Sequence, residues 1–462
     1  MFVILMGGRL YLDYRIEPLI LCSAVIAGFM AWYLHCQWQQ LEEAILNKIN
    51  VTMQGMLIIF SVGCMVGAWM FCGTVPFMVY WGLELVNPNY MLLSAFLICA
   101  LTSCCTGTSW GSAATIGVAM IGIAHGLGIP LAPVAGAALS GCYVGDKLSP
   151  LSDTTNLAPA VAGATTYEHI GHMFYTTIPG TILCCIVFFF ASSSVTGELH
   201  TPAQVQDFMN QLTEIYKLHF LLAVPPLLLI TGSILRWPIL PTIILTTILS
   251  VALGCLLQGF DLRWGILSTT TGFKVSMTHY LATPTESVQT LLNRGGMMGV
   301  LENMGMLCVA MAFGGIMHGS GMLTVVLQKM LKRVRSDGGL IASTLLSCVV
   351  LCFSTGSAYM GILIPGSLFK ESYLKRRLHP KNLSRALEDS ATMLDGAIPW
   401  ASGAVYMSGV LGVSAFEYVP WMVFNYSSVF IGLCHAWDRH REDKRRGRQG
   451  AAGHLANGYR ID

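Results

Sequence analysis

The chain has 462 residues, of which 54% are hydrophobic and only 11% charged, and its formal net charge is +2. Soluble domains carry about 25% charged residues, so this composition excludes an ordinary water-soluble protein and indicates a polytopic membrane protein. Long apolar runs, such as residues 178–191 and 239–257, predict helices, because the strands of a membrane barrel would alternate polar and apolar residues. We expect an all-α protein in contact with the lipid bilayer and without nucleic acid as a partner.

The N-terminus does not resemble a cleavable signal peptide, because the apolar residues 1–6 are too few for a signal core. The fifteen cysteines lie inside apolar segments without the Cys/His spacing of a zinc site. We interpret them as small apolar residues that pack between helices.

Apolar windows of roughly 20 residues predict the membrane spans. In chain order they lie near residues 18–36, 53–73, 129–163, 170–192, 218–235, 238–258, 297–318, 384–412 and 418–436. Two further stretches, 90–125 and 339–374, are too long for one span and carry a polar break in the middle. We interpret each of these two as a re-entrant hairpin.

A shift of the chain by 249 positions aligns the two halves without a gap. It pairs Thr106-Gly107 with Thr355-Gly356, Asp146 with Asp395, and Pro150 with Pro399. This recurrence predicts two repeats, each with a re-entrant hairpin and an interrupted transmembrane helix.

The charges predict how the repeats are oriented. Basic residues at 329–335 and 375–381 flank the second hairpin on both sides, whereas the flanks of the first hairpin carry none. Positive charge marks the cytoplasmic side, so the repeats should have inverted topology, as in many secondary transporters. We expect a first repeat at 1–192, a connecting loop and linking helix at 193–237, a second repeat at 238–437 and a basic cytoplasmic tail at 438–462.

Polar residues gather at two predicted breaks of the first half, residues 106–111 and 146–156. Broken backbone at membrane depth is tolerated where it lines a cavity, and clustered oxygen atoms suit a small hard cation. We predict sodium ligands at Asp146, Asp153 and Asn156. The full set of primary candidates for ion or proton binding is Thr108, Ser109, Asp146, Ser152, Asp153, Thr154, Asn156 and Asp395. The secondary candidates are Thr106, Lys147, Thr155, Glu302, Ser357, Glu388, Asp389 and Ser402.

Each feature also has a purely structural interpretation. Glycines such as Gly141 and Gly145 allow close helix packing, and serine or threonine hydroxyls in membrane helices bond to their own backbone. Glu388 and Asp389 could cap a helix that begins near Ser384. If one carboxylate instead binds sodium or a proton in turn, this competition couples the two ions. No nucleotide-binding motif is apparent, so we expect an ion gradient to supply the energy.

Residues 107–111 and 145–163 closely resemble the NhaC family of sodium/proton antiporters, and the similarity continues through 169–179 and 387–412. The resemblance implies a bacterial inner-membrane antiporter that works by alternating access, needs no cofactor and is not an enzyme. A homodimer is left open. Where the family often places Asn after Pro-Trp, this chain has Ala401, which leaves the substrate open. Similar sequences include exchangers that couple sodium and protons to malate and lactate, and amino-acid transporters.

Two other classes are compatible with membrane-embedded acids. An intramembrane aspartyl protease could use Asp146 and Asp395, but Tyr143 stands where its Gly-x-Gly-Asp motif needs the first glycine. A channel could use oxygen-lined breaks as a filter, but it needs no titrating carboxylate. An antiporter explains both the membrane-embedded acids and the oxygen-lined breaks.

Overall fold

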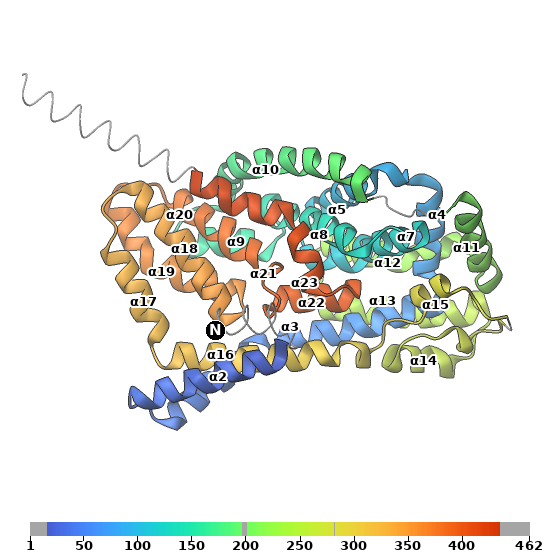
Figure 1. Cartoon of the computed structure of the whole chain (residues 1–462), viewed down its shortest axis with the longest axis horizontal. Helices are drawn as coiled ribbons and strands as arrows, with labels where there is room; N and C mark the ends of the chain where they lie inside the picture. Colours follow the sequence, from blue (N-terminus) through green and yellow to red (C-terminus); the bar gives the residue numbers. More distant parts are fainter. Residues whose placement is uncertain (1–15, 196–200, 281, 435–462) are drawn as a thin grey trace, which may run out of the picture.

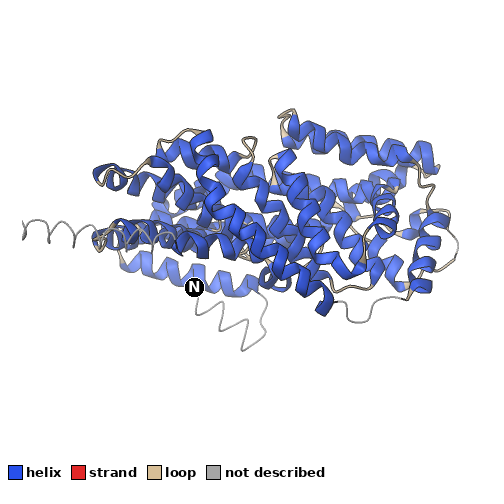
Figure 2. Cartoon of the chain, turned by 90° about the horizontal axis from the view of Figure 1, so that it is seen from above, coloured by secondary structure: helices blue, strands red, loops and turns tan. Residues whose placement is uncertain are grey.

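The structure is a computed structural model that describes residues 16–195, 201–280 and 282–434. The described residues form helices and no strand (Figure 2). Seven of the helices in these ranges are long and apolar enough to cross a membrane, or eight if one bent pair counts as a span. The predicted all-α membrane fold is confirmed. The expectations for the signal peptide and for the basic tail concern residues outside the described ranges.

The first half contains the helices α2 (Ile16–Tyr33), α3 (Trp38–Cys72), α4 (Thr74–Leu85), α5 (Met91–Thr106), α6 (Ser109–Ser112), α7 (Val118–Leu127), α8 (Leu131–Leu148), α9 (Asp153–Ala162) and α10 (Thr166–Val195). They are followed by α11 (Pro202–Ile215), α12 (Val224–Ile234), α13 (Ile239–Leu253), α14 (Leu262–Thr271), α15 (Glu286–Leu292) and α16 (Leu301–Gly319). The remaining helices are α17 (Met322–Lys332), α18 (Asp337–Thr355), α19 (Ala358–Lys375), α20 (Pro380–Leu387), α21 (Met393–Asp395), α22 (Ser402–Leu411), α23 (Ala415–Tyr418) and a last helix at Val423–Cys434.

Short irregular helices join these elements. π-helical turns connect α6 to α7 at η2 (Ala113–Gly117), extend α13 at η4 (Gly254–Gln258) and connect α20 to α21 at η7 (Glu388–Thr392). The 3-10 turns are η1 (Pro88–Tyr90), η3 (Phe220–Ala223), η5 (Val275–Met277), η6 (Met297–Val300) and η8 (Val419–Trp421). The single span expected at 218–235 needs correction, because that segment is the second part of a pair bent by 98° after α11.

The backbone repeats at the same offset of 249 as the sequence. α5 and α18 both end on a left-handed glycine, Gly107 (φ 71°) and Gly356 (φ 62°). The following residues, Thr108 (φ −145°, ψ 125°) and Ser357 (φ −146°, ψ 123°), have the same extended conformation before the next helix begins. Equal conformations at equivalent positions support the duplication. The domain boundaries stay predictions.

The later elements repeat as well. α8 and the α20–η7–α21 segment end near Asp146 and Asp395, and the chain is then broken before the paired helices α9 and α22. Figure 1 shows the α18–α19 pair at the left end of the molecule and α5 and α7 towards the right, with α21 and α22 between them. This arrangement agrees with the inverted topology predicted from the charges.

Small residues hold the helices around the breaks together. α8 packs on α5 so closely that a Cβ atom at Gly141 would clash with the carbonyl of Phe96, and one at Gly145 with Ser103. The packing role predicted for these glycines is confirmed. The segment Ser109–Leu127 is 83% buried in its apolar window, whereas Thr166–Val195 is only 22% buried. The second limb of the first hairpin therefore lies inside the bundle, and α10 presents apolar side chains outward, as a lipid-facing helix does.

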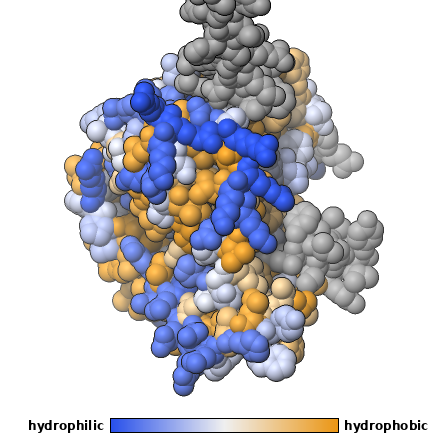
Figure 3. Space-filling model, turned by 90° about the vertical axis from the view of Figure 1, so that its left-hand side faces the viewer, coloured by the Kyte–Doolittle hydropathy of each residue, from blue (hydrophilic) through white to orange (hydrophobic). Residues whose placement is uncertain are grey.

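The left-hand end of the molecule contains the basic flanks of the second hairpin. Lys329, Lys332 and Arg333 at the end of α17 and Lys375 at the end of α19 carry its charge, and all four are exposed. Figure 3 shows this end, where hydrophilic side chains surround a hydrophobic area. Both ends of the hairpin therefore carry the charge that marks a cytoplasmic face.

Candidate ion-binding site

The carboxylate of Asp146 lies where two backbone breaks meet. Asp146 is in the last turn of α8 and is only 8% exposed. Its Oδ1 accepts hydrogen bonds from the backbone N–H of Ser109 (3.1 Å), at the start of α6, and from the hydroxyl of Ser152 (3.3 Å), just before α9. The predicted candidates Asp146, Ser109 and Ser152 are therefore in direct contact.

The contact between the breaks depends on Gly107. Its positive φ favours glycine, and a Cβ atom there would clash with Leu151. The hydroxyl of Thr155 donates to the backbone carbonyl of Asp146, which ties α9 back to the end of α8. The hairpin tip and the α8–α9 break consequently form one compact unit around the carboxylate.

Asp395 occupies the equivalent place in the second half and is 7% exposed. The hydroxyl of Ser402 donates to its Oδ1 (3.3 Å), and the backbone N–H groups of Ala358 and Gly403 also face the carboxylate. Ala358 follows Ser109 by 249 residues, so the first residue of the helix after each hairpin break faces an acid. The repeat thus produces two buried acids with the same backbone partner.

Tyr143 reaches from the first acid to the second. It lies on α8, one turn before Asp146, and its buried hydroxyl has no hydrogen-bond partner among the described residues. A Cβ atom at Gly403 would lie 3.0 Å from this hydroxyl and would clash with the carboxylate of Asp395. The tyrosine hydroxyl is therefore next to Asp395. Its spacing of three residues from Asp146, on the same helix face, was the available sequence signal.

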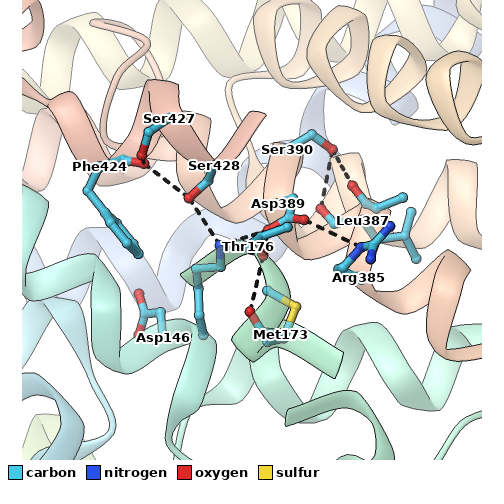
Figure 4. A network of polar contacts seen from close by, with 12 residues as sticks. Asp146, Met173, Thr176, Arg385, Leu387, Asp389, Ser390, Phe424, Ser427 and Ser428 are labelled. Atoms are coloured by element: carbon cyan, nitrogen blue, oxygen red, sulfur yellow. Dashed lines mark hydrogen bonds and ion pairs between the residues drawn. The ribbon is translucent and has the colours of Figure 1, made fainter. Parts of the chain in front are cut away.

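A buried ion pair joins the two halves beside this site (Figure 4). Lys147 Nζ lies 2.7 Å from Asp389 Oδ1, and both side chains are fully buried. The ammonium also donates to the hydroxyls of Ser428 (3.0 Å) and Thr176 (3.3 Å), and Thr176 donates to Asp389 (2.9 Å). Hydrogen bonds of this kind offset part of the cost of removing both charges from water.

The same network extends along the π-helical turn η7. Arg385 Nε lies 3.8 Å from Asp389 Oδ2, and the Phe424 ring lies 5.3 Å from Lys147 Nζ. Glu388 is fully buried in the same turn, and neither of its carboxylate oxygens has a hydrogen-bond partner among the described residues. The capping alternative for Glu388 and Asp389 is wrong, because their helix begins at Pro380 and the two acids lie in its middle. π-helical turns occur often at functional sites.

The other two members of the predicted sodium triad, Asn156 and Asp153, make no hydrogen bond to the Asp146 carboxylate among the described residues. Asn156 donates to the carbonyls of Pro150 (2.9 Å) and Ser152 (2.8 Å) and accepts from Thr166 (3.0 Å), so it supports the α8–α9 loop. Asp153 is exposed in the first turn of α9. The triad stays a prediction.

The other candidates have local partners. Thr108 caps α6 by accepting from the Gly111 N–H (3.4 Å), and Thr106 contacts the Ser112 hydroxyl (3.0 Å). Thr154 contacts Ser152 (3.2 Å). Ser357 is buried at the second hairpin tip, and Glu302 is exposed in the first turn of α16.

Lys48 is a buried cation, and no other lysine or arginine follows it in the chain until Lys147. It lies within the membrane helix α3, is 5% exposed, and its Nζ has no hydrogen-bond partner among the described residues. Its charge acts on Asp395. A lysine inside an apolar span was the signal that could have identified it.

A helical membrane bundle with repeated, interrupted helices around buried carboxylates defines a secondary transporter. A sequence model of the Na+/H+ antiporter family matches residues 141–436, which include both acids and the Lys147–Asp389 pair. The chain is 40% identical over 94% of its length to an uncharacterized Na(+)/H(+) antiporter of Haemophilus influenzae, of which 93% is covered. The chain belongs to the Na+/H+ antiporter family, whose members are transporters and not enzymes.

Two further relatives are 32% identical to the chain. The Na(+)/H(+) antiporter NhaC of Alkalihalophilus pseudofirmus matches over 90% of the chain and 88% of the relative. The Malate-2H(+)/Na(+)-lactate antiporter of Bacillus subtilis matches over 94% of the chain and 92% of the relative. The NhaC resemblance found in the sequence motifs is therefore confirmed.

Proposed function

We propose that the protein exchanges sodium ions for protons across the bacterial inner membrane by alternating access. Membership of the Na+/H+ antiporter family and the similarity to relatives named NhaC support this proposal. The observation that carries it is the Asp146 carboxylate, which is buried at the contact of two backbone breaks and is bound by Ser109 and Ser152.

A carboxylate in this position can couple the two ions. An ionised acid removed from water is costly unless an opposite charge or hydrogen bonds compensate it. A sodium ion or a proton would each neutralise Asp146, and the two cannot occupy the same oxygens together. Exchange follows if the site changes sides only when one of the two is bound.

Sodium at Asp146 would find further oxygen atoms nearby. The hydroxyls of Ser152 and Thr154 lie 3.2 Å apart at the start of α9, and the carboxylate of Asp153 begins the same helix. Oxygen ligands of this type suit a small hard cation. Lys147 is already paired with Asp389, so its ammonium holds the α8–α9 break in position and does not take part in ion binding.

The proposed sidedness rests on charge. The basic flanks of the second hairpin and the Arg-rich segment 439–448 would lie on the cytoplasmic side. In this orientation the second hairpin begins and ends on the cytoplasmic side of the membrane, and the first hairpin begins and ends on the outer side.

The test is sodium-driven proton movement in proteoliposomes that contain a pH-sensitive dye. We expect sodium alone to release protons from vesicles with the wild-type chain and no release with Asp146→Asn. Asp207→Asn, which removes an exposed acid of α11, is the matched control and should exchange normally. Full exchange by Asp146→Asn would refute the proposal, and sodium uptake without proton movement would indicate a channel.

A further inference from the structure

Lys48 differs from the other buried cations of the described residues, because it has no direct partner. Its Nζ atom exposes less than 1 Å² and makes no hydrogen bond or ion pair among those residues. Lys147 and Arg385, which are also buried, both lie near Asp389. A buried ammonium is strongly unfavourable unless a negative charge compensates it. An acid in the neighbourhood of Lys48 must therefore supply this charge.

The elements that hold Asp395 also reach α3, the helix of Lys48. The hairpin tip faces the Asp395 carboxylate through the N–H of Ala358, and α22 binds it through the hydroxyl of Ser402. α22 packs on α3, and Thr355 at the hairpin tip lines the same cavity of about 280 Å³ as Lys48. The charges of Lys48 and Asp395 interact across this region, although they form no direct ion pair.

The other titratable groups around Lys48 do not compensate its charge inside the protein. The Cys352 thiol donates to two backbone carbonyls (3.7 and 3.9 Å), so it is neutral. Glu43 and His318 line the cavity, but both are exposed at its mouth, where water solvates them. Asp395 is therefore the buried acid that can balance the charge of Lys48.

The first acid has no equivalent cation. The Asp146 carboxylate accepts hydrogen bonds but forms no ion pair among the described residues. At the offset of 249 that relates the two acids, the position of Lys48 corresponds to the uncharged Met297. A cation that neutralises Asp146 must therefore come from outside the protein, whereas Asp395 has one built into α3.

We propose that Lys48 is the fixed counter-ion of Asp395, so that the second acid binds no transported cation and Asp146 is the single acid that exchanges sodium for protons. The inference deepens the proposed exchange and rests on it for transport, but not for the charge balance between Lys48 and Asp395. A fixed positive charge also repels sodium from the second acid. Lys48 thus restricts sodium to the first site.

The first test measures the thermal midpoint of the full-length protein in detergent at several pH values. Lys48→Met leaves Asp395 buried without a cation, and a carboxylate in that state must take up a proton. Because the unfolded chain does not need this proton, the midpoint of the variant should fall relative to wild type between about pH 5 and about pH 8. Lys48→Met combined with Asp395→Asn should lose this extra pH dependence, because both charges are gone.

Two controls assign the effect to this pair of charges. Lys48→Met introduced into Asp146→Asn protein should add the same pH dependence as it does in the wild type, because Asp146 is not the acid that Lys48 balances. Lys332→Met, which removes an exposed lysine of α17, should leave the midpoint at its wild-type value at every pH.

The second test is sodium-driven proton movement in proteoliposomes with equal protein content. Lys48→Met and Asp395→Asn should each lower the rate by about tenfold, and the double variant should recover most of the wild-type rate. Lys48→Arg keeps the positive charge and should retain part of the rate. Equilibrium binding of radioactive sodium should give one sodium ion per wild-type protein.

Several results would overturn the proposal. They are a Lys48→Met variant with wild-type stability and rate, losses that simply multiply in the double variant, and two sodium ions bound per wild-type protein. Should Lys48→Met fail to fold, the double variant with Asp395→Asn decides: it should fold, and its failure to fold would also refute the pairing. A wild type that moves no protons against sodium would refute the proposed exchange, and the stability measurements would still decide on the counter-ion.

Discussion

The two halves of the molecule place an acid in the same backbone frame but surround it with different side chains. Asp146 has hydroxyls at Ser152, Thr154 and Thr155, whereas the equivalent positions 249 residues later are Ala401, Gly403 and Ala404. The residue after each acid differs as well, since Lys147 corresponds to Gly396. The duplicated backbone determines where the acids lie, and the side chains added to it determine which one is suited to bind an ion.

The surroundings of the two acids also differ in charge. Lys147, next to Asp146, forms an ion pair with Asp389 of the other half, whereas Lys48, which interacts with Asp395 at longer range, has no hydrogen bond or ion pair among the described residues. At the first site the charges of Lys147 and Asp389 compensate each other, which leaves the Asp146 carboxylate as the group that a cation would neutralise. At the second site the opposite charges of Asp395 and Lys48 interact without a direct ion pair.

The largest expected difference is between the two acids themselves. Asp146→Asn should lower sodium-driven proton movement by about 100-fold or more, and Asp395→Asn by about tenfold, because only the first has a full set of oxygen neighbours. The measurement is the initial rate of dye response in proteoliposomes with equal protein content. Equal losses in both variants would show that the halves are functionally equivalent.

The buried ion pair should make the next largest contribution. Lys147→Met leaves the buried Asp389 with only the longer contact to Arg385 (3.8 Å) and the Thr176 hydrogen bond, which should cost about 3 kcal/mol, whereas Lys147→Met combined with Asp389→Leu should restore part of this stability. Unfolding in detergent, monitored by circular dichroism, measures the stability of the single and the double variant. A double variant no more stable than the single one would show that the two charges are not coupled.

The two hairpin glycines separate the effect of conformation from that of crowding. Both glycines have a positive φ, but a Cβ atom at Gly107 would clash with Leu151, whereas one at Gly356 meets the flexible end of Met311 at 3.0 Å, the Trp400 carbonyl at 3.1 Å and the Cα atom of Ala401 at 3.6 Å. We expect a loss of about 3 kcal/mol for Gly107→Ala and about 1 kcal/mol for Gly356→Ala. The same unfolding measurement checks this order, and the reverse order would contradict it.

The smallest effect concerns one hydroxyl. Ser152→Ala removes a hydrogen bond to Asp146, so the sodium concentration that gives half-maximal exchange should rise by about 2- to 10-fold. Ser402→Ala, the hydroxyl on Asp395, is the counterpart and should change it less. The measurement is a sodium titration of the initial exchange rate. An unchanged titration for Ser152→Ala would remove this hydroxyl from the site.

Much of the fold could be predicted from the sequence because its signals are local or periodic. Apolar length gives the spans, a polar break inside a long apolar stretch gives the hairpins, and the gapless offset gives the repeat. The bend after α11 was missed, because hydropathy reports the length of an apolar segment and not its direction.

The candidate site was predicted only in part, because its contacts join residues far apart in the chain. Asp146, Ser109 and Ser152 belong to two recognisable motifs, and their contact follows once the breaks meet. The partner of Lys147 lies 242 positions away, and no sequence spacing identifies it. Tyr143 was missed for a related reason, since its hydroxyl faces a glycine of the other half.

The buried ion pair between Lys147 and Asp389 limits how the protein can move. It connects the end of α8 to η7 through two fully buried side chains, so the breaks of the two halves are held together inside the protein. Breaking this buried ion pair in every transport cycle would add a large free-energy barrier. We therefore expect the two acids to move together during transport, with this ion pair intact.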